Sequence, residues 1–330
     1  MTHGRLTRAL ATASVALCAA AAAVGAPLAW ITNQGSHTVS VVDLATRRVV
    51  ATVPVGRSPA GVVAVPARGE VVVSNADDEA LTVLAMQPPR ELARLPVGPG
   101  VVGLDASADG GRVFAADWYR QRLKVFDLPA RRLIADVPLG RAPAGVAALP
   151  DGAQAWVAER DDNRVALVDV ARAEVIARVP VGQHPFALLL DTPRQRLFAL
   201  NVLSDDISVI DTRQRQVVAT LKVGKAPYGA ALADDARRLY VTNQHDDSVS
   251  VFDADSLAPL ATLHGFGYPE GIAAQGAQVL VVNWMDDDLS VLDAASGRLI
   301  TRIALGRNPR GFGAFIGTPP DLSLARKETP

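Results

Sequence analysis

One position of the chain recurs seven times as a polar residue, at intervals of 42 residues and, for the last interval, 40. Five of these residues are Asn, but two adjacent repeats carry Asp117 and Glu159 instead. Short polar side chains at a fixed position are typical of turn capping, which Asp can also provide and Glu provides poorly. Asp117 and Glu159 are therefore candidate ligand-binding residues, with turn capping as the alternative. The series is Asn33, Asn75, Asp117, Glu159, Asn201, Asn243 and Asn283.

A second position, between a recurring Pro and a recurring Gly, carries large side chains in four consecutive repeats. Phe186 and Tyr228 can stack on a ligand, whereas Glu270 and Arg310 can grip a polar group. Aromatic walls with a few convergent polar groups are what a small-molecule pocket needs. The sequence therefore predicts a binding site at these four residues, with local packing and a structural Glu–Arg ion pair as the alternative.

Histidines and tryptophans lie in loops near these two positions. His184 and His264 precede the Pro positions of two repeats and can approach Glu270, so they are candidate ligands of a divalent metal. Their spacing matches no helical or Cys-x-x-Cys metal motif, and solvated loop histidines are the alternative. Trp118 and Trp284 directly follow the recurring polar position. An exposed ring there suits a ligand or partner, and packing between repeats is the alternative.

Five of the same loops are rich in acidic residues, which are the ligands that calcium prefers. No stretch shows the Asp-x-Asp-x-Asp-Gly pattern of a calcium loop, and Asp is also a common turn residue. Ordinary turns are therefore expected, and the cofactor stays undetermined, with a divalent metal as the one candidate. The acidic loops are 77–79, 161–162, 205–206, 246–247 and 286–288.

The chain lacks the motifs of common enzymes, such as the Gly-x-Ser-x-Gly elbow, His-Glu-x-x-His and the phosphate-binding Gly loop. Its one cysteine, Cys18, lies in the N-terminal segment, so the remainder has no thiol for a disulfide, a metal or a nucleophile. The formal net charge of −1 provides no basic excess for phosphate contacts. A nucleic-acid partner is not expected, and binding is favoured over catalysis.

Short strands must position all of these residues. In the repeat that ends at Gly224, an apolar run at 197–201 precedes an alternating segment at 207–211 and a third segment at 217–223. Pro227 then opens a fourth apolar segment, and Pro begins a strand without needing a donor. Gly, Pro and Asp separate the segments in register in nearly every repeat. Each repeat is therefore predicted to form four strands.

A period of 40–45 residues built from short strands is typical of propeller blades. Seven copies predict an all-β fold, a seven-bladed β-propeller with four antiparallel strands per blade. The first blade, 29–56, lacks an inner strand, and the last Pro-x-Gly segment, 309–316, has no strands after it. We expect this C-terminal strand to join the N-terminal blade, because closure removes exposed sheet edges. The repeats start near residues 29, 71, 113, 155, 197, 239 and 279.

Residues 1–26 have the features of a secretory signal peptide. Arg5 and Arg8 form a basic region, and residues 9–24 are apolar and mostly Ala. The segment is short and weakly hydrophobic for a membrane span, and an uncleaved anchor is the alternative. The sequence predicts cleavage near residue 26, a propeller at 27–316 and a flexible tail at 317–330. It therefore predicts a periplasmic or secreted monomer that is not embedded in a membrane.

Three segments carry a resemblance to a known family. Residues 239–243 read Leu-Tyr-Val-Thr-Asn, residues 250–253 read Ser-Val-Phe-Asp, and residues 224–229 read Gly-Lys-Ala-Pro-Tyr-Gly. Over about residues 29–316 the chain resembles the YVTN-repeat seven-bladed β-propellers. Such proteins are mostly exported and bacterial; some resemble the propeller subunits of periplasmic amine dehydrogenases, and others occur beside quinone-dependent alcohol oxidation systems. The resemblance implies that the Pro-x-Gly strand lines a central channel and that its neighbouring loops form the binding surface.

Three functional hypotheses follow. The favoured one is an exported, non-catalytic propeller that binds a small molecule or a periplasmic protein on its loops, as an accessory of periplasmic oxidation. The second is a metal-dependent lactonase- or lyase-like propeller, with the metal held by Glu270 and either His184 or His264. The third is a nucleic-acid-binding propeller that uses Trp118, Trp284 and basic loops, and the net charge argues against it.

Overall fold

A computed structural model describes residues 25–320, and their strands follow the repeat of the sequence. In each repeat, apolar runs form the middle strands, which are buried on both faces. In the fifth repeat these are β17 (Arg196–Asn201) and β18 (Asp206–Asp211), whereas β19 (Gln216–Lys222) is mostly exposed. The outermost strand of each repeat therefore faces solvent, and burial is greatest in the two middle strands.

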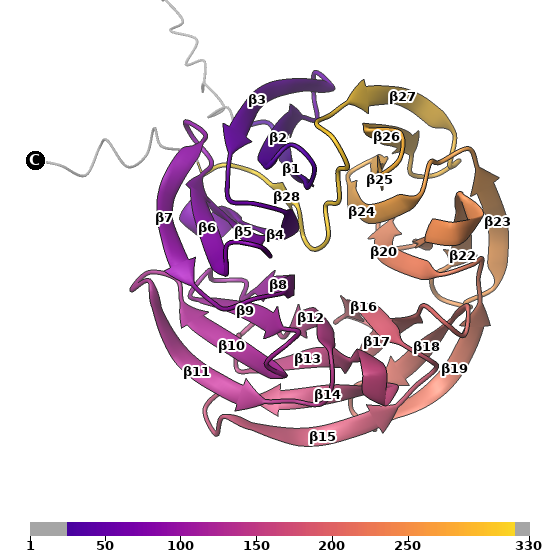
Figure 1. The fold of residues 1–330 in the computed structure, drawn as a ribbon. Coiled ribbons are helices and arrows are strands. Elements are labelled where there is room, and N and C mark those ends of the chain that lie inside the picture. Colours follow the sequence, from indigo (N-terminus) through magenta and orange to yellow (C-terminus); the bar gives the residue numbers. More distant parts are fainter. Residues whose placement is uncertain (1–24, 321–330) are drawn as a thin grey trace, which may run out of the picture. The chain divides into compact units, whose positions relative to one another are not determined.

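Seven four-stranded antiparallel sheets stand in a ring, which confirms the predicted all-β, seven-bladed β-propeller (Figure 1). Blades 1 to 3 contain β28 (Ile316–Gly317), β1 (Leu28–Asn33), β2 (Thr38–Asp43) and β3 (Arg48–Pro54); β4 (Pro59–Val65), β5 (Glu70–Asn75), β6 (Ala80–Ala85) and β7 (Arg90–Pro96); and β8 (Val101–Ala106), β9 (Arg112–Asp117), β10 (Arg122–Asp127) and β11 (Arg132–Pro138).

Blades 4 to 7 repeat the same order from the axis outward. They contain β12 (Pro143–Ala148), β13 (Gln154–Glu159), β14 (Arg164–Asp169) and β15 (Glu174–Pro180); β16 (Pro185–Asp191), β17, β18 and β19; β20 (Pro227–Ala233), β21 (Arg238–Asn243), β22 (Ser248–Asp253) and β23 (Pro259–His264); and β24 (Pro269–Gln275), β25 (Gln278–Asn283), β26 (Asp288–Asp293) and β27 (Leu299–Ala304).

Helical structure in the described residues is limited to single turns. These are the 3₁₀ helices η1 (Pro66–Arg68), η2 (Arg160–Asp162) and η3 (Gln244–Asp246). Between residues 25 and 320 there is no helix with the length and apolarity needed to cross a membrane.

The apolar faces of neighbouring blades pack against each other and form the core. The largest fully buried side chains include Trp30, Trp156, Tyr240, Phe114 and Phe198. Clusters of buried residues join one blade to the next, as where Phe114 of blade 3 packs with Val146 and Val157 of blade 4. Because no described residue is a cysteine, this apolar burial and the closure of the ring hold the blades together.

The C-terminal segment closes the ring on blade 1, as the sequence predicts. Ile316 and Gly317 of β28 pair with Ala29 and Leu28 of β1, and Pro309 forms a bridge with Asn33. The ordered strand thus extends to Gly317, one residue into the segment predicted as a flexible tail. Residues 321–330 of that tail and residues 1–24 of the predicted signal peptide lie outside the described residues.

The middle of the closing segment differs from the predicted inner strand. Between Arg310 and Phe315 the chain leaves β1 and lies against β4, where Val62 N–H donates to the carbonyl of Phe312 at 2.9 Å. Gly311 (φ +62°) and Gly313 (φ +121°) adopt left-handed conformations, which glycine alone adopts readily. The segment therefore enters the middle of the ring, where Figure 1 shows it in yellow.

Candidate functional site

All of the sequence-predicted site residues lie at one end of the ring, which we call the loop face. Each inner strand begins there opposite the recurring polar residue, as the pairs Pro59–Asn75 and Pro185–Asn201 show. The loops before the inner strands and those after the recurring polar residue therefore gather at this end. The fold thus brings the predicted site residues to the same end of the ring. The contacts of each side chain then indicate its role.

Phe186 and Tyr228 close the central channel just below the loop face, together with Phe312. The ring centroids of Phe186 and Tyr228 are 4.6 Å apart, and Phe312 lies 5.0 Å from Phe186 and 5.8 Å from Tyr228. All three residues are more than nine-tenths buried. We call these three residues the aromatic plug. Their rings contact each other at distances typical of favourable aromatic pairs, which leaves little ring surface for a ligand.

Glu270 and Arg310 form a buried pair beside the aromatic plug. Glu270 Oε2 lies 3.3 Å from Arg310 Nε, and Glu270 Oε1 accepts hydrogen bonds from Gln244 at 2.9 Å and from Arg310 at 3.3 Å. Burial raises the pKa of Glu270 to about 7, although Arg310 acts to lower it. Burial also raises the pKa of Tyr228 far above its ordinary value, so this phenol stays protonated. The structure brings all four predicted residues of the Pro-x-Gly position together.

Trp118 and Trp284 lie half-buried at two separate places on the loop face. The ring of Trp118 is 6.3 Å from Phe186, and the guanidinium of Arg160 lies over it at 5.2 Å. The ring of Trp284 is 5.5 Å from that of Tyr268. In each case the residue after the tryptophan, Tyr119 or Met285, is more than half exposed. Apolar side chains therefore extend outward from both tryptophans toward solvent.

Asp117 points into its own blade. Its carboxylate is fully buried, with Oδ2 3.5 Å from Lys124 Nζ, and Oδ1 accepts the backbone N–H of Arg120 at 3.0 Å. Lys124 occupies a position seven residues after the recurring polar residue. In the five repeats with Asn this position carries a hydroxyl instead, as Ser40, Thr82, Ser208, Ser250 and Ser290. The acid and its cation therefore depart from the repeat together, and the pairing accounts for both.

Glu159 also has partners within its own blade. It is fully buried, accepts the backbone N–H of Gly140 at 2.6 Å, and forms ion pairs with Arg164 and with Arg178, the latter at 3.1 Å. Gly140 ends the preceding blade, so Glu159 also joins blade 4 to blade 3. The longer side chain thus fulfils a structural role that a short polar residue fulfils elsewhere in the ring.

The five recurring asparagines share one set of contacts. In each, the side-chain amide donates to groups on the next strand, as Asn243 Nδ2 does to Ser248 Oγ at 3.0 Å and to Ser250 Oγ at 2.9 Å. These side chains are almost fully buried. Their geometry agrees with a structural role at the turn. The residues are Asn33, Asn75, Asn201, Asn243 and Asn283.

His184 and His264 occupy different surroundings. His184 is half-buried near Arg160, and burial together with that cation lowers its pKa. His264 is exposed at the end of the outermost strand β23, whereas Glu270 lies on the innermost strand β24. Within residues 25–320, no group of three or more His, Asp or Glu side chains is arranged to hold a metal ion. The metal site therefore stays a sequence prediction without geometric support.

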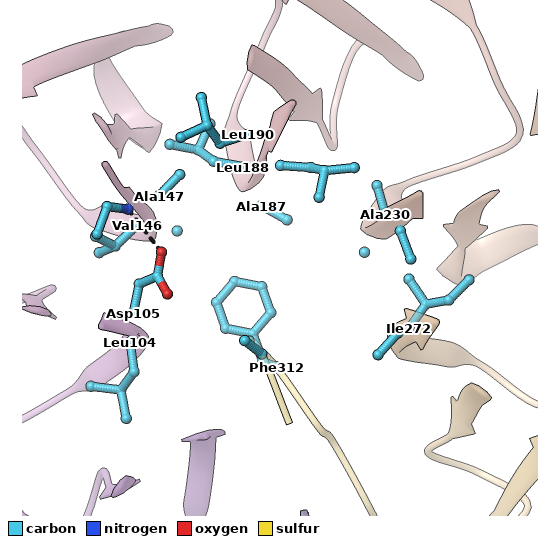
Figure 2. A pocket seen from close by; sticks show the side chains of 18 of the residues that line it. Leu104, Asp105, Val146, Ala147, Ala187, Leu188, Leu190, Ala230, Ile272 and Phe312 are labelled. Carbon is cyan, nitrogen blue, oxygen red and sulfur yellow. Dashed lines mark hydrogen bonds between the residues drawn. The ribbon is translucent and has the colours of Figure 1, made fainter. Parts of the chain in front are cut away.

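A cavity of about 550 Å³ occupies the channel on the other side of the aromatic plug (Figure 2). We call it the channel cavity. It is lined by inner strands of blades 3 to 7 and by the closing segment, and Phe312 forms its floor. This site is not among those predicted from the sequence, although Asp105 departs from the repeat. The corresponding residues of the other repeats are all apolar: Val63, Ala147, Leu189, Ala231, Ala273 and Gly313.

Comparisons with known proteins add information about the fold. No protein-family model matches the chain, and no curated protein matches it in sequence. Among solved structures, hydrazine synthase of Kuenenia stuttgartiensis is similar with a TM-score of 0.70 and 16% identity, over 76% of this chain and 87% of that chain. A functionally unknown protein from Desulfotomaculum acetoxidans DSM 771 has a TM-score of 0.77 and 16% identity, over 89% of this chain and 99% of that chain.

These identities are low enough that the likeness shows a shared fold alone. The seven four-stranded sheets and the likeness together establish the fold class. The chain is a seven-bladed β-propeller.

Proposed function

We propose that this protein is an exported, non-catalytic propeller of the YVTN-repeat type that binds a protein partner through its loop face. The observation that carries this proposal is a set of exposed apolar side chains around the closed channel mouth. Tyr119, Leu203 and Met285 lie two residues after the recurring polar position in blades 3, 5 and 7, and each is more than half exposed. The resemblance to exported propellers makes periplasmic oxidation systems the setting in which to seek the partner.

The composition of this surface favours a protein partner. Aromatic residues, Met and Arg are enriched in protein interfaces, and buried rings behind the contact surface provide rigid anchors. Half-buried Trp118 and Trp284 stand directly beside Tyr119 and Met285. A small molecule would have less to contact here, because the rings of the aromatic plug already pack against each other. A partner protein can instead cover several exposed side chains at once.

The charges of the loop face are largely paired within it, which disfavours nucleic acid. Arg57 contacts Asp78 at 2.7 Å, and Arg141 contacts Asp162 at 2.7 Å. These basic side chains are therefore balanced by acids rather than offered to phosphates, and nucleic-acid binding depends on such free cations.

The enzyme hypothesis has less support. A metal at Glu270 would have to compete with Arg310 and Gln244, which already contact both carboxylate oxygens. A metal site also needs several convergent ligands, and neither predicted histidine joins Glu270 in any hydrogen bond or ion pair among residues 25–320.

The proposal is tested with two matched triple variants of the full chain. One replaces Tyr119, Leu203 and Met285 by Ser. The other replaces three residues of the outermost strands by Ser as well. These are Val50, Val218 and Leu260, which are also at least half exposed. Each variant is expressed in an exporting host, cross-linked in a periplasmic extract and compared with the parent by mass spectrometry of captured proteins.

We expect the loop-face variant alone to lose the captured partner, with at least a tenfold fall in the affinity measured afterwards with purified partner. Retention of that partner by the loop-face variant, or its equal loss in both variants, would contradict the proposal. Export is tested separately by fractionating cells that express the chain with and without residues 1–26. Only the longer chain should reach the periplasm, with a mass that shows cleavage.

A further inference from the structure

We propose that the channel cavity is a second binding site, which takes a small molecule with an apolar body and one protonated amine held by Asp105. This site lies on the far side of the aromatic plug from the loop face, so the inference goes beyond the proposed function and does not depend on it. Three observations carry it: the shape of the cavity, the chemistry of its wall and the contacts of Asp105.

The channel cavity has the size and form of a ligand site. Its volume of about 550 Å³ lies in the range of roughly 300–1,000 Å³ that small-molecule sites occupy. Phe312 closes its inner end, because this residue lines the cavity and its ring also contacts Phe186 and Tyr228. Its lining continues to Ala108, Pro150 and Thr192, which follow the last residues of the inner strands. A ligand would therefore enter from the face opposite the loop face.

The side chains that line the channel cavity are mostly apolar, with one ionisable group, and backbone groups of the inner strands add polar surface between them. Leu104, Val146, Leu188 and Ile272 are among the residues that line the cavity around the ring of Phe312 (Figure 2). Of all the lining side chains only Asp105 and Thr192 are polar, and only Asp105 can carry charge. These apolar side chains favour a ligand with a hydrocarbon body.

Asp105 is held in place but has no cationic partner. Its Oδ1 accepts the backbone N–H of Ala106 and its Oδ2 that of Ala148 on the neighbouring inner strand, each at 2.8 Å. Each oxygen can accept a further hydrogen bond. Only burial and these two N–H groups act on its pKa, which burial raises to about 6, and no ion pair to it exists among residues 25–320. At pH 7.5 the carboxylate is therefore mostly charged.

A carboxylate in an apolar wall without a counter-ion is costly, and an opposite charge relieves that cost. A protonated amine fits because it donates charge-assisted hydrogen bonds to the free acceptor sites of Asp105. An anionic ligand would be repelled, and an alcohol of the same length would gain the apolar contacts without the charge. The chemistry of the wall thus selects an amine with a hydrocarbon body.

Binding of an amine by Asp105 can be distinguished from a purely structural role of this residue. The carboxylate joins β8 to β12 through Ala148, and Asn at this position would retain an acceptor oxygen for that hydrogen bond. Asp105→Asn therefore removes the charge while it preserves the shape of the side chain. Asp109→Asn is the matched control, because Asp109 is an exposed acid in the adjacent turn and does not line the channel cavity.

The test is calorimetric titration of the full chain at pH 7.5 with three probes of equal length: hexylamine, 1-hexanol and hexanoate. We expect hexylamine to bind at least tenfold more tightly than 1-hexanol, and hexanoate most weakly. Asp105→Asn should reduce the hexylamine affinity to that of 1-hexanol or below it, because the ammonium then has no counter-ion, whereas Asp109→Asn should leave the affinity unchanged. Thermal unfolding of each variant shows whether it is folded.

A second variant keeps the test decisive if Asp105→Asn does not fold. Ala230 lies on the opposite wall (Figure 2), and Ala230→Leu narrows the channel cavity without touching Asp105. This variant should weaken the binding of hexylamine and of 1-hexanol by the same factor, so that the ratio of their affinities stays unchanged. Equal affinity of the unaltered chain for hexylamine and 1-hexanol, or no binding of either at millimolar concentration, would overturn the proposal. The loop-face triple variant should bind hexylamine normally, which separates this inference from the proposed function.

Discussion

Two residues that replace the recurring Asn are explained by their partners within the same blade, whereas each residue by itself could be either structural or functional. Considered by itself, Asp117 is an acid at a position that usually carries Asn, which makes it a candidate ligand-binding residue. Together with Lys124 it becomes one half of an ion pair that replaces the Asn–hydroxyl contact of the other blades. Glu159 with Arg164 and Arg178 is a second such replacement. A residue that departs from the repeat is therefore best interpreted together with the residue that it contacts.

A double-mutant cycle tests this interpretation of Asp117. Lys124→Thr leaves a fully buried carboxylate without its cation and should destabilise the protein by about 3 kcal/mol, as expected when a buried ion pair loses one partner. The double variant Asp117→Asn/Lys124→Thr recreates the contact seen between Asn75 and Thr82 and should recover most of that loss. Urea unfolding of the parent, both single variants and the double variant measures the cycle. Additive effects would mean that the two side chains do not act as a pair.

The Glu270–Arg310 pair should make the stability of the folded protein depend on pH. The pKa of Glu270 in the folded protein, about 7, lies above its ordinary value of 4.5. Between these values the unfolded chain binds fewer protons than the folded protein, so this residue makes stability fall as pH rises from 4.5 to 7. Arg310 opposes the shift, so its removal should raise the pKa of Glu270 further and extend this loss above pH 7.

Arg310→Ala should therefore destabilise the protein by about 3 kcal/mol at pH 8 and much less at pH 5, where Glu270 is protonated. Urea unfolding at both pH values gives the difference. Arg57→Ala is the control, because Arg57 is exposed and the ordinary pKa of its partner Asp78, 3.8, keeps that carboxylate mostly ionised at both pH values even without Arg57. An effect of Arg310→Ala that is the same at pH 5 and pH 8 would show that the charge of Glu270 is not involved.

At the scale of elements, the closing segment does two things at once. Its ends complete blade 1, through Pro309 opposite Asn33 and Ile316 opposite Ala29. Its middle lies against β4 and places Phe312 in the channel, where that ring divides the loop face from the channel cavity. Gly311 and Gly313 make this path accessible, because both have positive φ.

Gly313→Ala should disrupt that path. A methyl group on Gly313 would overlap the carbonyl oxygen of Val62, and its φ of +121° is strained for any other residue. Gly276→Ala provides the control, since Gly276 has φ +54° and open space around it. Thermal unfolding should show a clearly larger loss for Gly313→Ala than for Gly276→Ala, which should cost about 1 kcal/mol. Equal losses would mean that the close contact with β4 contributes nothing.

At the scale of the whole molecule, ring closure determines whether blade 1 has a protected inner edge. Without the C-terminal segment, β1 would expose unpaired backbone groups, among them the N–H of Trp30 that donates to the carbonyl of Phe315 at 2.8 Å. Open sheet edges invite association with other chains. The fully buried ring of Phe315 also packs in the core cluster of blade 1. Closure therefore protects the edge and completes the core.

A chain that ends at Gly306 should therefore be less soluble and unfold at a lower temperature than the full chain. Addition of a peptide with the sequence of residues 307–330 should restore both properties, because the segment pairs through backbone hydrogen bonds that do not require covalent continuity. A peptide of the same composition in scrambled order serves as the control. Full stability of the shortened chain by itself would refute the role of closure. Light scattering and calorimetry provide the measurements.

The sequence by itself determined the architecture of this protein. Seven repeats in register can bury their apolar faces only by stacking against one another, and the unmatched segments at the two ends can complete only one blade. These features depend on periodicity, which is a property of the chain that needs no knowledge of three-dimensional contacts. The location of the candidate site at one end of the ring was implied instead by the resemblance to YVTN-repeat propellers.

Only the tertiary structure decided what the individual side chains contact. Phe312 reaches Phe186 and Tyr228 because two glycines divert the closing segment, and no repeat predicts that path. The partners of Glu159 come from three different segments of the chain. Asp105 was visible in the sequence as a departure, but its meaning depends on a cavity that five inner strands and Phe312 enclose together. Contacts between distant segments carry no periodic signal, so their chemistry becomes apparent only when the ring is closed.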